Sequence, residues 1–171
     1  MMRNSFIVLL FLIIYGCKKN DEIQLPYTTH TGANTFGCKI NGETFVTSGD
    51  PSASWSNSGV KYSFYADSSI AIDAKQESPK KYIYFRFKFN SAPGIYHLND
   101  DYQYIGTFTD LSDGSTAVNG GNEYNSSSKH TGTITVTNYD GHIIAGTFSF
   151  DAVNDSGQLV HITEGRFDIK R

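Results

Sequence analysis

The segment 81–90 constrains the fold most, because polar and apolar side chains alternate along it from Tyr82 to Asn90. The residues of one parity are apolar: Ile83, Phe85, Phe87 and Phe89. The residues of the other parity carry polar groups: Tyr82, Tyr84, Arg86 and Lys88. Successive side chains of a strand point to opposite faces, whereas a helix would distribute these aromatic rings around its axis. The segment therefore predicts a strand with one buried face, and burial of each apolar side chain stabilises the fold by roughly 1.5–3 kcal/mol.

Short turn sequences separate further alternating segments, which indicates antiparallel pairing. The clearest turn is Asn41-Gly42, because both residue types tolerate the positive φ angles of a tight hairpin turn. Turns of this length cannot make the long crossovers that parallel strands need. We expect an all-β domain of roughly ten strands, either an antiparallel β-sandwich or a flattened β-barrel, with a long loop over residues 110–129.

Four strand segments begin with glycine and continue with alternating polar and apolar residues. These glycines are Gly106, Gly132, Gly146 and Gly165. Each has the parity of the apolar residues in its strand and is therefore expected on the core side. A missing side chain at such a position lets a large ring or another backbone approach closely.

The first seventeen residues have the order of a secretory leader. Arg3 supplies a positive charge, residues 6–14 are apolar, and Gly16 precedes Cys17. The apolar run is shorter than the roughly twenty residues that a membrane span needs. The segment resembles the bacterial lipobox, although Tyr15 stands where a small residue is usual. This resemblance implies a signal peptide over 1–16 and a fatty-acylated Cys17, such as a palmitate-bearing one, that anchors the chain in a membrane.

Residues 17–33 are polar and lack periodicity, so we expect a flexible tether before a single β domain over 34–171. Within this segment, residues 19–22 resemble the surface-export signal of Bacteroidetes lipoproteins, while an ordinary solvated charge cluster is an equally good interpretation. Two longer segments, 31–42 and 162–169, resemble an uncharacterised family of small Bacteroidetes lipoproteins. That resemblance implies a β fold, anchored by lipid at the bacterial outer membrane and either periplasmic or surface-exposed, with no assigned activity.

Charge, motifs and cysteine content indicate which partners, cofactors and disulfides to expect. The net charge is −3, and removal of the leader with Arg3 changes it to −4. Because the chain is acidic and has no basic stripe, we do not expect nucleic acid as a partner. The sequence contains no recognisable cofactor motif, and we expect no cofactor. If Cys17 is acylated, Cys38 has no disulfide partner, and we expect it to be a buried strand thiol.

Aromatic side chains on polar strand faces give the one positive indication of a binding site. The candidates are Trp55, Tyr62, Tyr82, Tyr84 and Tyr104. Rings with a polar group stack on sugars and anchor protein interfaces, so exposed rings gathered on one face would mark a site for a glycan or an envelope protein. The alternative is that these tyrosines form cross-strand pairs that only stabilise the sheet.

Two other chemistries remain as weaker hypotheses. Asp110, Asp113 and Asn122 place oxygen ligands on a loop, as calcium prefers, but without a known calcium-binding spacing. A small envelope hydrolase would need two carboxylates across a cleft, and the candidates are Asp100, Asp151, Glu164 and Asp168. The outward parity of Glu164 and Asp168 predicts solvated side chains instead. We therefore expect a non-catalytic binding or structural accessory module, with a hydrolase as the alternative.

Overall fold

The computed structural model describes residues 23–49, 59–99, 101–115 and 122–171. These residues form eleven antiparallel strands and no helix, so the expectation of an all-β fold is confirmed. The strands are β1 (Thr35–Ile40), β2 (Glu43–Val46), β3 (Val60–Phe64), β4 (Ser69–Glu77), β5 (Lys80–Lys88), β6 (Gly94–Leu98), β7 (Ile105–Asp110), β8 (Asn122–Asn125), β9 (Gly132–Tyr139), β10 (Ile143–Val153) and β11 (Leu159–Lys170). Within this part of the chain, no helix is long and apolar enough to cross a membrane.

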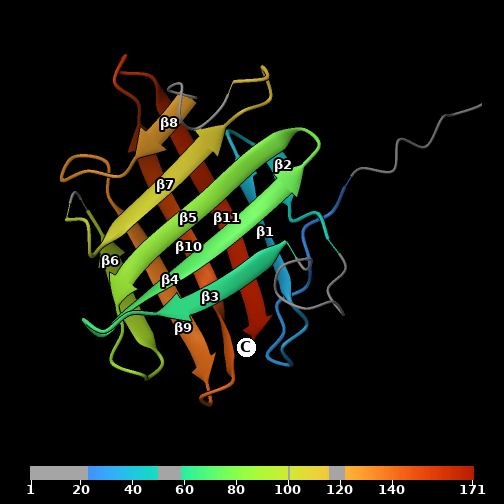
Figure 1. Ribbon diagram of the computed structural model, residues 1–171, viewed down its shortest axis with the longest axis vertical. Helices are drawn as coiled ribbons and strands as arrows, with labels where there is room; N and C mark the ends of the chain where they lie inside the picture. The colour runs from blue at the N-terminus through green and yellow to red at the C-terminus, as the bar shows by residue number, and fades with distance from the viewer. Residues whose placement is uncertain (1–22, 50–58, 100, 116–121) are drawn as a thin grey trace, which may run out of the picture.

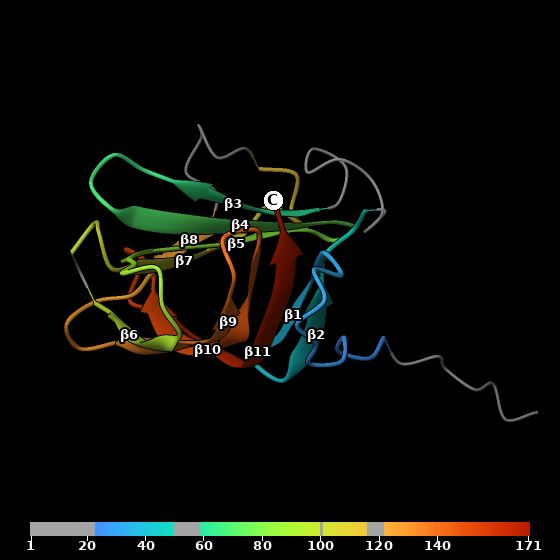
Figure 2. The ribbon, with the colours of Figure 1, turned by 90° about the horizontal axis from the view of Figure 1, so that it is seen from below.

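All strands belong to one continuous sheet that curls into a half-barrel. The hydrogen-bonded order is β2-β1-β11-β10-β8-β7-β5-β4-β3. Strand β9 pairs with β10 on the same edge as β8, opposite β11, and β6 pairs with β9. Figure 2 shows two facing layers, one of β3, β4, β5, β7 and β8 and the other of β1, β2, β6, β9, β10 and β11. The strands of the two layers cross at an angle (Figure 1). We call them the upper and the lower layer.

Strand β8 explains how the two layers become one sheet. It lies in the segment where the sequence indicated only a long loop, and it pairs with β7 on one side and with β10 on the other. Asn125 is the residue shared by both pairings, opposite Thr107 and Val153. The arrangement agrees with the expected antiparallel fold and combines features of both expected architectures, because the sheet curls as a barrel does while its layers face each other as in a sandwich.

The alternating residues of β5 bury one face of the strand, as the sequence predicts. Ile83, Phe85 and Phe87 are buried, and Phe89 is buried just beyond the strand. In the core, the Phe85 ring centroid lies 5.0 Å from that of Phe148 in β10, and Phe148 lies 4.9 Å from Phe36 in β1. These ring contacts join the upper layer to the lower layer.

The tight hairpin between β1 and β2 also forms as expected. Asn41 has a φ of 49° and Gly42 a φ of 88°, so both central residues of the turn adopt the left-handed region. Cys38 precedes this turn and is fully buried among the core residues, and burial raises the pKa of its thiol. The predicted buried strand thiol is therefore present.

Each glycine of the repeated strand pattern pairs across the sheet with a phenylalanine. The register pairs are Gly106 with Phe85, Gly132 with Phe150, Gly146 with Phe167, and Gly165 with Phe148. A Cβ at Gly165 would lie 2.6 Å from two ring atoms of Phe148, and a Cβ at Gly146 would lie 2.8 Å from the Phe167 ring. The expectation that these glycines admit large rings on the core side is confirmed.

The segment 25–32, which we call the N-terminal strap, lies against the outer side of the lower layer. Leu25 and Pro26 cover Gly37 of β1 so closely that a Cβ there would lie 2.6 Å from Pro26 Cδ. Arg166 of β11 donates a hydrogen bond to the Pro26 carbonyl over 3.3 Å. The flexible tether expected up to residue 33 is therefore attached to the domain along the strap, and residues 17–22 lie outside the described residues.

Asp168 of β11 is the main attachment point of the strap and is only 1% exposed. Its Oδ2 accepts hydrogen bonds from Thr29 Oγ1 at 2.5 Å and from the Thr31 N–H at 2.9 Å, and its Oδ1 accepts from the Gly32 N–H at 2.8 Å. Burial raises the pKa of this carboxyl, but the hydrogen bonds outweigh burial and hold the pKa below its ordinary value. The prediction of a solvated Asp168 is wrong, because strand parity does not reveal that the strap covers this face.

We expect Gly165→Ala to destabilise the domain by about 1–3 kcal/mol, because the new methyl group would overlap Phe148. Chemical denaturation of the purified protein measures this free energy. Gly94→Ala is the matched control, since a Cβ there meets only ordinary contacts of 3.7–3.8 Å with Tyr96. Equal stability of the two variants would contradict the proposed role of the Gly165–Phe148 pair.

We expect Asp168→Asn to lower the free energy of unfolding by about 1–3 kcal/mol at neutral pH, since its amide group cannot accept all the donors of the strap. The ionised carboxylate stabilises the fold above its unfolded pKa of about 3.9, and this contribution is lost as the pH falls through the lower folded value. The difference in the free energy of unfolding between the wild type and Asp168→Asn should therefore become smaller in acid. Asp155→Asn, in an exposed turn, is the control, and a constant difference at all pH values would refute this account.

Candidate functional site

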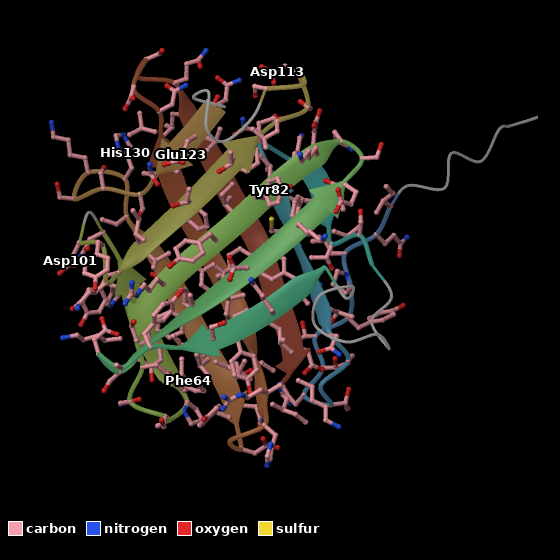
Figure 3. The ribbon with its side chains drawn as sticks, viewed as in Figure 1. Phe64, Tyr82, Asp101, Asp113, Glu123 and His130 are labelled. Carbon is pink, nitrogen blue, oxygen red and sulfur yellow. The ribbon has the colours of Figure 1, made fainter. Side chains whose placement is uncertain are left out.

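The outer side of the upper layer carries a hollow of about 310 Å³ between β3, β4 and β5. Tyr82 and Tyr84 of β5 line it together with Asp73 and Lys75 of β4 and Lys61 of β3. The sheet register explains this grouping, because Asp73 is opposite Tyr84, Lys75 is opposite Tyr82, and Lys61 is opposite Asp73. Figure 3 shows Tyr82 on this outer side, above the middle of the upper layer.

The charges around the hollow nearly cancel. Asp73 is partly buried, and this burial raises the pKa of its carboxyl while the nearby Lys61 lowers it. Lys75 Nζ lies 2.9 Å from a carboxylate oxygen of Glu77. The hollow therefore offers a carboxylate acceptor and ammonium donors without a strong net charge.

A second group of rings adjoins the hollow around Arg86 of β5. The guanidinium carbon of Arg86 lies 4.2 Å from the Tyr65 ring centroid and 4.5 Å from the Tyr102 ring centroid. Cation–π attraction stabilises such contacts. Tyr84 lies two residues before Arg86 on the same face of β5, and burial, followed by the neighbouring Tyr65, raises the pKa of Tyr84 to about 12.

Asp67 holds Arg86 in place from the turn between β3 and β4. Arg86 Nη2 lies 2.9 Å from Asp67 Oδ2, and Arg86 Nε donates to Ser69 Oγ over 2.7 Å. A hydrogen bond from Ser69 Oγ and, more weakly, the Arg86 charge lower the pKa of Asp67 to about 2. Gln103 Nε2 donates to the same carboxylate over 3.0 Å, so a loop after β6 is tied to the turn.

We call Tyr65, Tyr82, Tyr84 and Tyr102, with Arg86, the outer tyrosine face. Tyr65 is 44% exposed and Tyr102 is 60% exposed, whereas Tyr82 and Tyr84 are half-buried in the hollow. Flat rings with hydroxyl groups, placed next to charged donors and acceptors, can stack on a ligand and hydrogen-bond to it. The arrangement suits recognition of a ligand.

The sequence identified only part of this face. Tyr82 and Tyr84 lie on it, but Tyr62 is 7% exposed and donates a hydrogen bond to the His142 carbonyl from within the core. Tyr104 packs partly buried against the core. Tyr62 and Tyr104 were therefore predicted wrongly as outward rings, and Trp55 lies outside the described residues.

Sequence reasoning missed Tyr65, Tyr102 and Asp73. Tyr65 and Tyr102 stand in turns, where alternation gives no information about direction, and they become neighbours only through Arg86. The sequence did contain a signal for Asp73, because it is a charged residue at an outward-facing position of the otherwise apolar first half of β4. Its distinguishing feature, however, is its partial burial beside Tyr84, which depends on strand pairing.

The carboxylates considered for hydrolysis do not form a shared cleft among the described residues. Asp151 Oδ1 lies 2.7 Å from His161 Nδ1, and Glu164 Oε1 lies 2.7 Å from Lys39 Nζ. The Asp168 carboxylate binds the strap, and Asp100 lies outside the described residues. The three described carboxylates thus have separate partners and do not face one another as an acid–base pair would.

The calcium candidates serve as turn and strand residues. Asp110 Oδ1 accepts the Ser112 N–H over 2.9 Å and its Oδ2 lies 3.9 Å from Lys81 Nζ, while Asn122 is opposite Asp110 in the β7–β8 pairing. Asp113 accepts the Ser115 N–H in the following loop (Figure 3). In the part of the chain that the structure describes, no three or more His, Cys, Asp or Glu side chains form a group suited to a metal ion.

Comparison with known proteins identifies a family for most of this fold. Residues 48–168, more than half of the chain, match the model of a domain of unknown function, DUF6252. The match includes the outer tyrosine face and starts after β2. Neither the curated proteins nor the solved structures gave a match. The chain belongs to the DUF6252 family of domains of unknown function.

Proposed function

We propose that this protein is a lipid-anchored component of the bacterial cell envelope that binds a ligand through its outer tyrosine face, without catalysis. The observation that carries the binding role is the convergence of four partly exposed tyrosine rings around Arg86 and the adjoining hollow. Exposed aromatic side chains gathered on one face are typical of recognition surfaces.

The position of the strap agrees with an anchored binding module. The strap contacts the outer side of the lower layer, whereas Tyr82 and Tyr84 line the hollow on the outer side of the upper layer. Figure 2 shows the two layers facing each other. Only a few residues separate Cys17 from Ile23, and an extended chain of that length spans roughly 20 Å. A lipid on Cys17 would therefore keep the lower layer near the membrane and the tyrosine face directed away from it.

We expect Cys17→Ala, produced in a bacterium that processes lipoproteins, to abolish membrane association, because the acyl chains supply the membrane affinity. The measurement is the distribution of the protein between washed membranes and the soluble fraction. Cys38→Ala is the matched control, since Cys38 is buried in the core and should leave the distribution unchanged. An unchanged membrane fraction of the Cys17 variant, or an intact mass without added acyl groups, would refute the anchor.

We expect replacement of both Tyr82 and Tyr84 by Ala, in the Cys17→Ala protein that lacks the acyl anchor, to weaken binding of the purified full-length protein to isolated cell envelopes by about tenfold or more, since two stacking rings are lost. The assay is sedimentation with detergent-washed envelopes, and thermal unfolding checks that the variant is folded. Tyr27→Ala is the control, because Tyr27 is an 88% exposed ring outside this face. Equal retention of all three proteins, or retention of none, would contradict the proposed binding role.

A further inference from the structure

We propose that the ligand of the hollow between β3, β4 and β5 is a neutral glycan, with Tyr82 and Tyr84 as the stacking platform and Asp73 as the acceptor for sugar hydroxyls. This inference rests on the proposed binding function and adds the chemical class of the ligand.

The rings supply the first argument. Tyr82 and Tyr84 alternate with Ile83 along β5, so their side chains leave the same face of the sheet two residues apart. Partial burial in the hollow limits their rotation, and a restrained ring loses little further conformational freedom when a ligand stacks on it. The apolar faces of sugar rings suit such a platform, while their hydroxyl edges remain free for hydrogen bonds.

The polar groups supply the second argument. Asp73 is a partly buried carboxylate that lines the hollow next to Tyr84, and Lys61 and Lys75 flank it. A carboxylate accepts hydrogen bonds and an ammonium group donates them, whereas a hydroxyl group does both. A polyhydroxyl ligand is therefore complementary to this mixed set.

Charge favours a neutral glycan over an acidic one. Glu77 balances Lys75 at 2.9 Å, and Asp73 balances Lys61 across the strand pair. Arg86 is the cation with the geometry for binding a carboxylate or phosphate group, but Asp67 already occupies it at 2.9 Å. An anionic ligand would meet Asp73 and Asp67 without an unoccupied guanidinium group to compensate.

The size and composition of the surface favour a glycan over a folded protein. A stable protein interface covers about 800 Å² on each partner and has a hydrophobic centre. The centre of this face is instead concave. Its hollow of about 310 Å³ has a mostly apolar lining that also includes Lys61, Asp73 and Lys75. This volume falls at the lower end of the range for small-ligand sites, about 300–1,000 Å³. A few sugar rings match that space.

The test uses the purified full-length protein with Cys17→Ala, so that no acyl chain contributes to binding, and cell envelopes treated in two ways. Periodate oxidation destroys vicinal diols of sugars, and exhaustive protease digestion removes proteins. We expect periodate to abolish binding and protease to leave it intact. Binding that resists periodate and is lost after protease treatment would overturn the glycan inference while the proposed binding function stands. Absence of binding to untreated envelopes would overturn both.

Variants locate the ligand in the hollow. We expect Asp73→Asn, which preserves shape but removes the charge, to weaken binding to untreated envelopes and to immobilised neutral oligosaccharides by about tenfold, as for loss of a charged hydrogen-bond acceptor. Tyr82→Trp should retain binding, because a larger ring still stacks. Tyr27→Ala is again the control. Unchanged binding of Asp73→Asn, or stronger binding of sulfated than of neutral oligosaccharides, would overturn the assignment.

Discussion

The pairing of glycine with phenylalanine across neighbouring strands is the contact on which this fold depends. Gly165 faces Phe148 and Gly146 faces Phe167 in the β10–β11 pair, so each ring fills the space that a missing side chain leaves. The rings can then reach the centre, where Phe148 contacts Phe85 of the upper layer at 5.0 Å. Without those gaps, the two layers could not approach closely enough to share one core.

A sheet that curls over a shared core leaves two separate outer sides, and these differ in what covers them. The N-terminal strap covers the outer side of β1 and β11 through the buried Asp168 carboxylate and the contact of Pro26 with Gly37. The outer side of β3, β4 and β5 carries the tyrosines and the hollow. Under the proposed function, attachment and recognition would therefore involve opposite layers of the domain.

Particular residues show how far the sequence could be interpreted. The strand at Phe85, the turn at Asn41 and the core side of Gly165 were predictable, because each depends on a local pattern. The core position of Tyr62 was not predictable, because a tyrosine in an alternating strand is expected to point outward. Its hydroxyl instead donates a hydrogen bond to the His142 carbonyl inside the core. The burial of Asp168 was not predictable either, because the strap residues that cover it, Thr29 and Gly32, lie 139 and 136 positions away in the sequence.

The sequence alone determined the all-β class, the antiparallel turns and the buried face of the strand at 81–90, since alternation and turn chemistry act over a few neighbouring residues. Only the tertiary structure decided that β8 joins the layers into one curled sheet, that the strap binds Asp168, and that Tyr65 and Tyr102 enclose Arg86. These contacts join segments distant in sequence. Their formation depends on how the layers pack, and no local pattern encodes that packing.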